Sequence, residues 1–136
     1  MACIFCEGIE EKQILLQTEN YKVVLDIDPI QSGHLLIISK QHFMDVRELP
    51  DSTLIELFEL QKRIVNVFDT HFSVDGVSVI QNNGSIMDEG THFHIHLIPR
   101  YKGDDFWTHQ EVNCRPILIP ELVKQLQNER ELLPWK

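Results

Sequence analysis

The sequence predicts an α+β fold in which an antiparallel meander sheet of about five strands packs with two helices. Short runs rich in aliphatic and β-branched residues are separated by short turns, which favours hairpin connections over the long crossovers of a parallel sheet. One longer segment has the three-and-four spacing of an amphipathic helix. The 136 residues contain no repeat, low-complexity segment or Pro/Gly-rich linker, so we expect one domain over residues 1–136.

The first two expected strands form a hairpin. Residues 21–27 (YKVVLDI) are rich in β-branched side chains and end just before Pro29, which cannot donate to a strand ladder. Gly33 closes the turn, and residues 34–39 (HLLIIS) form a short apolar run. The two runs are predicted to pair as antiparallel neighbours.

The next element is the long helix, expected between Asp51 and His71, with Asp51 or Ser52 at its start. Its apolar residues fall on one face, and they are Leu54, Leu57, Phe58, Ile64, Val65 and Phe68. That face is predicted to be core, with no chemistry attached.

Two strands and a final helix complete the prediction. Residues 77–81 (VSVIQ) lead into an Asn-Asn-Gly turn, and residues 91–99 carry the histidines. Pro120 suits the first turn of a C-terminal helix that runs toward Leu133.

The composition restricts the classes of function. The 21 acidic and 12 basic residues give a formal charge of -9, which argues against a nucleic-acid partner but leaves room for a small phosphorylated ligand. The chain has neither a run of about 18 uncharged apolar residues nor a basic region followed by an apolar stretch at its start, so we expect no membrane span and no secretory signal. A cytoplasmic protein is the expectation.

Three cysteines argue against a secreted disulfide framework, because their number is odd and two lie close together. Cys3 and Cys6 form a C-x-x-C pair, which is typical of half a metal site and equally compatible with two reduced thiols.

The chemistry concentrates in the segment His92-Phe93-His94-Ile95-His96-Leu97. On a strand its three imidazoles face one side and its apolar residues the other. Successive side chains on one face lie about 6.7 Å apart, so His92 and His96 are too distant to share one metal ion easily. A polar strand face without function and a catalytic metal centre are the alternatives to a catalytic histidine pair.

This segment resembles the signature of the histidine-triad (HIT) nucleotide hydrolases and transferases, His-φ-His-φ-His-φ-φ with φ apolar, and residues 92–98 match all seven positions. The resemblance looks closest to a bacterial-type branch. It extends through most of the chain in family order, over Cys3–Cys6, Leu25–Pro29, Ser32–Lys40 with His42, Asn82–Gly84 and Ile98–Arg100.

The resemblance implies roles for three histidines. His94 would attack an α-phosphorus and form a covalent nucleotidyl-histidine, for which a neutral imidazole is a competent nucleophile. His96 would donate to the phosphate or the leaving group, and His34 looks like the family's further active-site histidine. Together they would stabilise the charge on the transferred group without a catalytic metal.

The resemblance also implies a nucleotide pocket, with a purine as the expected base. Asp26 would accept hydrogen bonds from ribose hydroxyls, although a turn aspartate explains it without function. Phe5 and Ile27 resemble the apolar residues that sandwich the base, Asn82 matches a polar ligand-binding position, and Thr91 offers a hydroxyl.

A structural zinc ion and a homodimer are further implications of the resemblance. Some branches bind zinc through residues that correspond here to Cys3, Cys6, His42 and His92. Two thiolates and two imidazoles make a closed tetrahedral site, which suits a structural role.

One segment departs from the family pattern. Many members carry Gly-Gln-Ser or Gly-Gln-Thr shortly before the triad, whereas residues 87–91 here read MDEGT. Asp88 and Glu89 would repel a phosphate if they faced it. The departure puts substrate preference in question and keeps open a nucleotide-binding regulatory or scaffold protein with little turnover.

Overall fold

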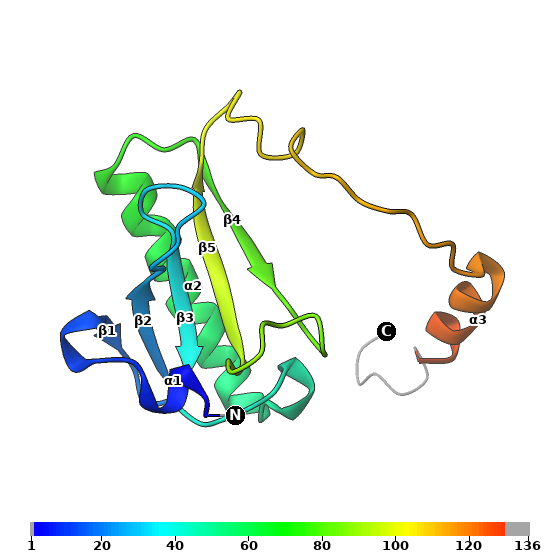
Figure 1. Cartoon of the computed structure of the whole chain (residues 1–136), viewed down its shortest axis with the longest axis horizontal. Helices are drawn as coiled ribbons and strands as arrows, with labels where there is room; N and C mark the ends of the chain where they lie inside the picture. The colour runs from blue at the N-terminus through cyan, green and yellow to red at the C-terminus, as the bar shows by residue number, and fades with distance from the viewer. Residues whose placement is uncertain (1, 130–136) are drawn as a thin grey trace. The chain divides into compact units, whose positions relative to one another are not determined.

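The structure, a computed structural model, describes residues 2–129 and divides the chain into two compact units (Figure 1). The first unit ends at Asp104 and contains the sheet, the long helix and every predicted site residue. The second unit begins at Asp105. The expectation of one domain over residues 1–136 stays a prediction.

The first unit is built on a five-stranded antiparallel sheet, which confirms the predicted class. The strand order is β1-β2-β3-β5-β4, so only the last two strands depart from a meander, because the long helix carries the chain past β3 to the sheet edge and β5 returns between. The strands are β1 (Ile14–Gln17), β2 (Tyr21–Leu25), β3 (Leu35–Ser39), β4 (Gly76–Gln81) and β5 (His94–Arg100).

Two strand ends differ from the prediction for identifiable reasons. β2 stops at Leu25, because the Asp26 carboxylate accepts a hydrogen bond from the Asp28 amide (2.8 Å) and starts the turn. β5 begins at His94, because the Phe93 amide donates to the Phe43 carbonyl (2.7 Å) and not to β3. β1 was not predicted, since its short run shows no alternation.

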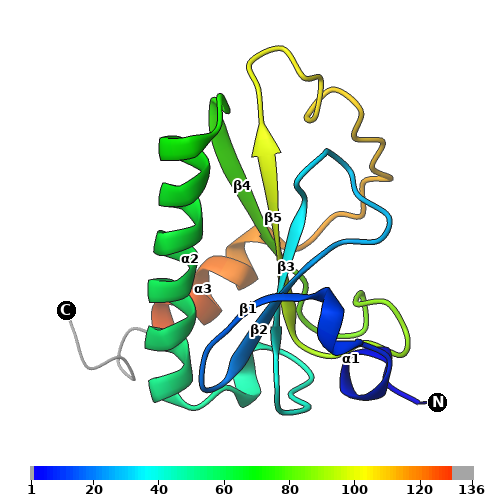
Figure 2. The same cartoon turned by 90° about the vertical axis from the view of Figure 1, so that its left-hand side faces the viewer.

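Helix α2 (Asp51–His71) covers one face of the sheet, as Figure 2 shows. Its buried residues Leu57, Leu60 and Ile64 pack against strand residues that include Val23, Ile37 and Ile95. Leu54 and Phe68 are partly buried against this core, whereas Phe58 and Val65 of the predicted face are exposed. Pro50 is the N-cap, so Asp51 opens the helix as its first residue.

The opposite face of the sheet carries a smaller apolar cluster and the histidines. Short helix α1 (Ile4–Glu7) places Phe5 against Val24, Leu36 and Ile38 there. Two 3-10 turns, Glu11–Gln13 and Val46–Glu48, complete the first unit.

The second unit contains helix α3 (Ile119–Glu129), which begins next to the predicted Pro120. The predicted continuation toward Leu133 lies outside the described residues. None of the described helices combines the length and the apolar character that crossing a lipid bilayer requires.

Candidate active site and metal centre

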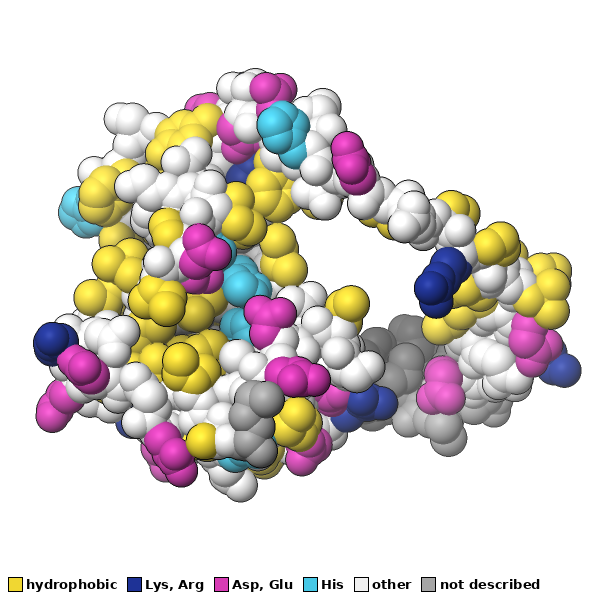
Figure 3. Space-filling view, viewed as in Figure 1, with side chains coloured by type: hydrophobic (Ala, Val, Ile, Leu, Met, Phe, Trp, Pro, Cys, Tyr) yellow, Lys and Arg dark blue, Asp and Glu magenta, His cyan; other side chains and the backbone are white. Residues whose placement is uncertain are grey.

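The alternation along β5 separates a core face from a histidine face. Ile95 and Leu97 belong to the core under α2, whereas His94 and His96 lie on the face that carries Phe5 and pair in register with Ile38 and Leu36. Figure 3 shows histidine side chains in the middle of this face with acidic side chains beside them. The predicted geometry is therefore confirmed for the second and third histidines of the motif.

One ring nitrogen of His94 is fixed by the backbone. Its Nδ1 lies 2.8 Å from the carbonyl oxygen of His92, and a carbonyl can only accept, so Nδ1 carries the proton. The lone pair then sits on Nε2. The side chain is 6% exposed, so the ring is held in a buried setting.

A second set of contacts joins His34, His96 and Asp26. The Ile30 amide donates to His34 Nδ1 (3.1 Å), which leaves the proton on His34 Nε2. That nitrogen lies 2.9 Å from His96 Nδ1 and 3.4 Å from Asp26 Oδ2. Since His96 Nδ1 accepts, its own proton is on Nε2.

Burial keeps these two imidazoles neutral. Desolvation lowers the pKa of His34, although the nearby Asp26 charge acts in the opposite direction. Desolvation, followed by the charges of His94 and His34, lowers the pKa of His96 to about 4, and the carboxylates of Asp26 and Asp88 oppose that fall. A neutral His96 with its proton on Nε2 therefore lies next to His94 at physiological pH, with 4.9 Å between the ring centroids.

The remaining predicted binding residues differ in exposure and in their contacts. Phe5 is buried and makes edge-to-face contacts with His94 (4.9 Å between ring centroids) and His92 (5.7 Å). Ile27 is 83% exposed at the turn after β2, and Asn82 is half-buried just after β4. The Thr91 hydroxyl donates to the Asp88 carbonyl (2.6 Å), so it stabilises the loop before the triad.

The first histidine of the motif, His92, belongs to a second cluster that consists of the four predicted zinc ligands. One ligand atom from each of Cys3, Cys6, His42 and His92 lies within 4.8 Å of all the others. The Cys3 and Cys6 sulfurs are 3.2 and 3.4 Å from His92 Nδ1, and the Cys6 sulfur is 3.2 Å from His42 Nδ1.

These atoms fit a tetrahedral zinc ion. Bond lengths of about 2.3 Å to sulfur and 2.05 Å to nitrogen place neighbouring ligand atoms about 3.6 Å apart, close to the separations found. His92 Nε2 donates to the Ser39 carbonyl (2.6 Å), so its Nδ1 lone pair faces the thiols. The donor set and its geometry therefore suit a closed metal site.

The sequence did not predict the contacts that anchor the loop before the triad. The buried Asp45 carboxylate pairs with Arg47 and accepts a hydrogen bond from the Gly84 amide (3.1 Å). At the far end of the loop, the Ile4 amide donates to the Gly90 carbonyl (2.7 Å). Gly84 in the Asn-Asn-Gly sequence indicated a turn, but its partner Asp45 is distant in sequence and could not be predicted.

The comparisons with known proteins agree with this geometry. The family model described as HIT domain matches residues 7–103. An uncharacterized HIT-like protein of Methanocaldococcus jannaschii is 35% identical over 106 residues, covering 75% of this chain and 81% of that protein. The adenosine 5'-monophosphoramidase HNT1 of Saccharomyces cerevisiae is 37% identical over 103 residues, covering 73% of this chain and 63% of the relative.

A solved structure extends the similarity to the fold. The crystal structure of a zinc-bound histidine triad family protein from Mycobacterium smegmatis has a TM-score of 0.66 and 27% identity, and the match covers 94% of this chain and 97% of that one.

Proposed function

The chain belongs to the HIT domain family, and from that premise we propose that it is a nucleotide-binding hydrolase or transferase that cleaves at the α-phosphate of a nucleoside phosphoramidate or phosphoanhydride. The observation that carries the proposal is the orientation of His94, whose Nδ1 donates to the His92 carbonyl and leaves the Nε2 lone pair available. The phosphoramidase named among the relatives supports the reaction class.

In the proposed reaction, His94 Nε2 attacks the α-phosphorus and forms a P–N bond. The bond to the leaving group breaks, and its electron pair departs with that group. Water or another acceptor then attacks the same phosphorus, and the electron pair of the P–N bond returns to His94. No separate base is required to generate the nucleophile, because with the proton on Nδ1 the lone pair of Nε2 is already available.

His96 and His34 stabilise the group in transfer. His96 Nε2–H donates to a phosphoryl oxygen or to the leaving atom, and His34 fixes its tautomer through the 2.9 Å contact. Because these donors offset the developing charge, the attack itself requires no divalent metal.

The proposed nucleotide pocket uses further residues. Asp26 accepts from the ribose hydroxyls, Phe5 and Ile27 contact a purine base, and Asn82 supplies a polar group beside the phosphate. The Thr91 hydroxyl, expected at the phosphate, donates to the Asp88 carbonyl and would have to release that bond to reach a ligand. The buried position of Phe5 against His94 supports a base site next to the nucleophile.

A structural zinc ion belongs to the proposal, held by Cys3, Cys6, His42 and His92. When bound, it supplies a crosslink between the N-terminal segment and the sheet. The zinc-bound relative supports this assignment. We also propose a cytoplasmic homodimer that binds neither nucleic acid nor membrane, in keeping with the formal charge of -9.

The test is hydrolysis of a fluorogenic adenosine 5'-phosphoramidate by the wild type and His94→Ala. We expect kcat/KM to fall at least about 10⁴-fold in the variant, because the nucleophile is lost. His71→Ala, at the end of α2, is the control and should keep the wild-type rate. Equal rates for wild type and His94→Ala would refute the mechanism and favour the regulatory or scaffold alternative.

A further inference from the structure

The cluster of proposed zinc ligands is partly open to solvent. Cys6 and His42 are exposed and Cys3 is half-buried, whereas His92 is buried. The Cys6 sulfur lies 3.2 Å from His42 Nδ1 and 3.4 Å from His92 Nδ1, so an exposed residue supplies one of the two sulfurs of the cluster. A small oxidant therefore reaches a thiolate of this site without unfolding the protein.

The two cysteines are also close enough to react with each other. Cys3 is the N-cap of α1 and Cys6 lies within that helix, and the Cys6 amide donates to the Cys3 carbonyl (3.1 Å). Their sulfur atoms lie within 4.8 Å of one another. Residues three apart in a helix have Cβ atoms about 5–6 Å apart, and a disulfide requires about 4 Å. A disulfide between them therefore needs only a small tightening of this turn.

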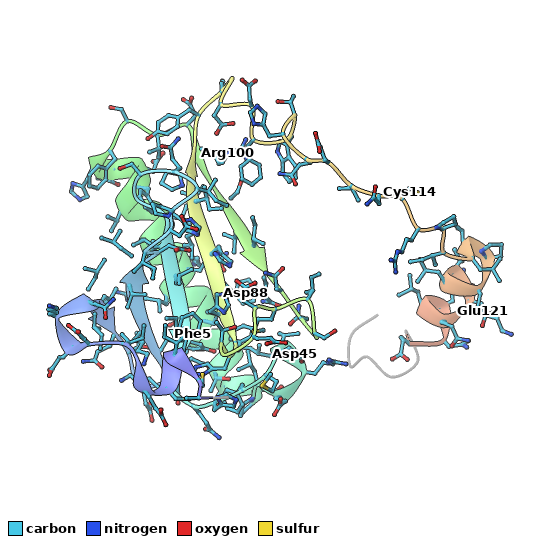
Figure 4. The ribbon with its side chains drawn as sticks, in the orientation of Figure 1. Phe5, Asp45, Asp88, Arg100, Cys114 and Glu121 are labelled. Atoms are coloured by element: carbon cyan, nitrogen blue, oxygen red, sulfur yellow. The ribbon has the colours of Figure 1, made fainter. Side chains whose placement is uncertain are left out.

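The same short helix carries Phe5 to the histidine face of the sheet. Phe5 lies over β2 and β3, as Figure 4 shows, and belongs to the smaller apolar cluster there. Its ring makes edge-to-face contacts with His94 and His92. Since Phe5 lies between the two cysteines in the sequence, a change in the turn that joins their sulfurs moves a residue that contacts the proposed nucleophile.

We propose that Cys3 and Cys6 form a peroxide-sensitive pair: hydrogen peroxide oxidises them to a disulfide, the site loses its zinc, and Phe5 shifts from its contact with His94. The inference goes beyond the proposed reaction and rests on the structural zinc ion proposed above. Thiolates react with peroxide more readily than thiols, and a coordinating metal keeps a cysteine in the thiolate form. Disulfides that form in the cytoplasm are usually transient and redox-sensing.

The oxidation balances with one molecule of hydrogen peroxide for each disulfide. The Cys6 thiolate attacks one peroxide oxygen, the O–O bond breaks, and its electron pair leaves with hydroxide, which yields a sulfenic acid. The Cys3 thiolate then attacks the Cys6 sulfur, and a second hydroxide leaves. The two sulfurs have then lost two electrons to the peroxide. His42 and His92 remain, and two imidazoles are too few to hold a structural zinc ion.

The test treats the zinc-loaded full chain with an equimolar amount of hydrogen peroxide. A chromogenic chelator measures the zinc released, and mass spectrometry locates the disulfide. We expect release of about one zinc per chain and the loss of two hydrogens from the peptide that contains Cys3 and Cys6. Dithiothreitol with added zinc should restore both thiols and the metal content, because a disulfide is the reversible product.

Two variants control the assignment of the reacting pair. Cys114→Ala removes the exposed cysteine of the second unit and keeps the pair, so it should behave as the wild type. Cys3→Ala leaves Cys6 without its partner and should form no disulfide between these positions. Oxidation confined to Cys114 would overturn the proposal. Zinc release without a disulfide between Cys3 and Cys6 would also overturn it, and so would a disulfide that leaves the zinc bound.

The affinity for AMP, measured by calorimetry, tests the effect on Phe5. The oxidised protein should bind AMP about tenfold more weakly than the reduced, zinc-loaded protein, the size of effect that one aromatic contact produces. In hydrolysis KM should change more than kcat, because Phe5 is proposed to contact the base and not the reacting atoms. An unchanged affinity would overturn the proposed coupling to His94.

These measurements separate the inference from the proposed function. If the wild type neither binds AMP nor hydrolyses a nucleoside phosphoramidate, the proposed function fails, whereas the zinc and disulfide measurements still decide whether Cys3 and Cys6 are the reactive pair. A reduced protein that takes up no zinc before peroxide is added would refute the structural zinc ion and this inference together.

Discussion

His92 and His94 are two residues apart, yet their rings are held in opposite ways. His92 donates through Nε2 to the Ser39 carbonyl and turns Nδ1 toward two thiols. His94 donates through Nδ1 to a carbonyl and leaves Nε2 available. The backbone carbonyl that binds one ring nitrogen therefore decides whether the other nitrogen of an imidazole faces a metal site or stays available to a ligand.

The largest effect is expected from a change in the metal cluster that holds His92. Cys3→Ala removes one thiolate, so we expect zinc content to fall to near zero. The free energy of unfolding should fall by roughly 3 kcal/mol and Tm by roughly 10 °C, because metal binding contributes to folding. Metal analysis and thermal unfolding measure both.

The same variant should keep kcat within about tenfold of the wild type if zinc is structural. Cys114→Ala, which changes the exposed third cysteine in the second unit, is the control and should alter neither quantity. If Cys3→Ala retained one zinc per chain, Cys3 would not be a zinc ligand, and the assignment of His92 to a metal site would be contradicted.

A smaller loss of stability is expected at acid pH, and it comes from His96 in its contact with His34 and Asp26. The folded-state pKa of His96, about 4, lies below the ordinary value of 6.5, so its contribution is present above pH 6.5 and is lost as the pH falls toward 4. Between about pH 7.5 and pH 5 the wild type should lose about 1.5 kcal/mol through this group, after allowance for solvent screening.

Urea unfolding of the wild type and His96→Asn at those two pH values measures the loss. The variant should lose less stability on acidification than the wild type. Equal losses would mean that burial of His96 does not govern its protonation.

The smallest effect concerns the turn that presents His34. Gly33 has a φ of 89°, and an added Cβ would lie 3.3 Å from Pro99 Cγ. Gly33→Ala should therefore cost about 1 kcal/mol and lower kcat/KM severalfold by shifting His34, with zinc content unchanged.

Gly84→Ala is the matched control for Gly33→Ala. Gly84 has a similar φ of 85°, but nothing lies within 4 Å of an added Cβ. It should show the backbone cost alone in urea unfolding and no change at His34. If Gly84→Ala lowers kcat/KM by the same factor, the effect does not come from His34.

The sequence predicted most of the fold because the signals were local. The three-and-four spacing in α2 and the alternation around Ile95 each follow from one segment. β1 escaped prediction, since Leu15 and Leu16 are both exposed and its pairing depends on β2. β5 starts at His94, later than predicted, because the Phe93 amide binds Phe43, a partner outside the histidine segment.

Much of the candidate site could also be predicted, but its contacts could not. The pairing of His34 with His96 depends on the register between β3 and β5. The placement of the loop before the triad depends on Asp45 and Ile4, which hold it at Gly84 and Gly90. The sequence showed that residues 87–91 depart from the family pattern, but their position depends on long-range contacts that the sequence does not reveal.

The anchoring of this loop at both ends has a consequence for how the protein can change over evolutionary time. Asp45 holds its start at Gly84, and Ile4 holds its end at Gly90. Insertions and replacements between those two points can alter what approaches the histidine face while β5 keeps its register. The loop is therefore a part of the molecule in which replacements can change the surroundings of His94 without moving the strand that carries it.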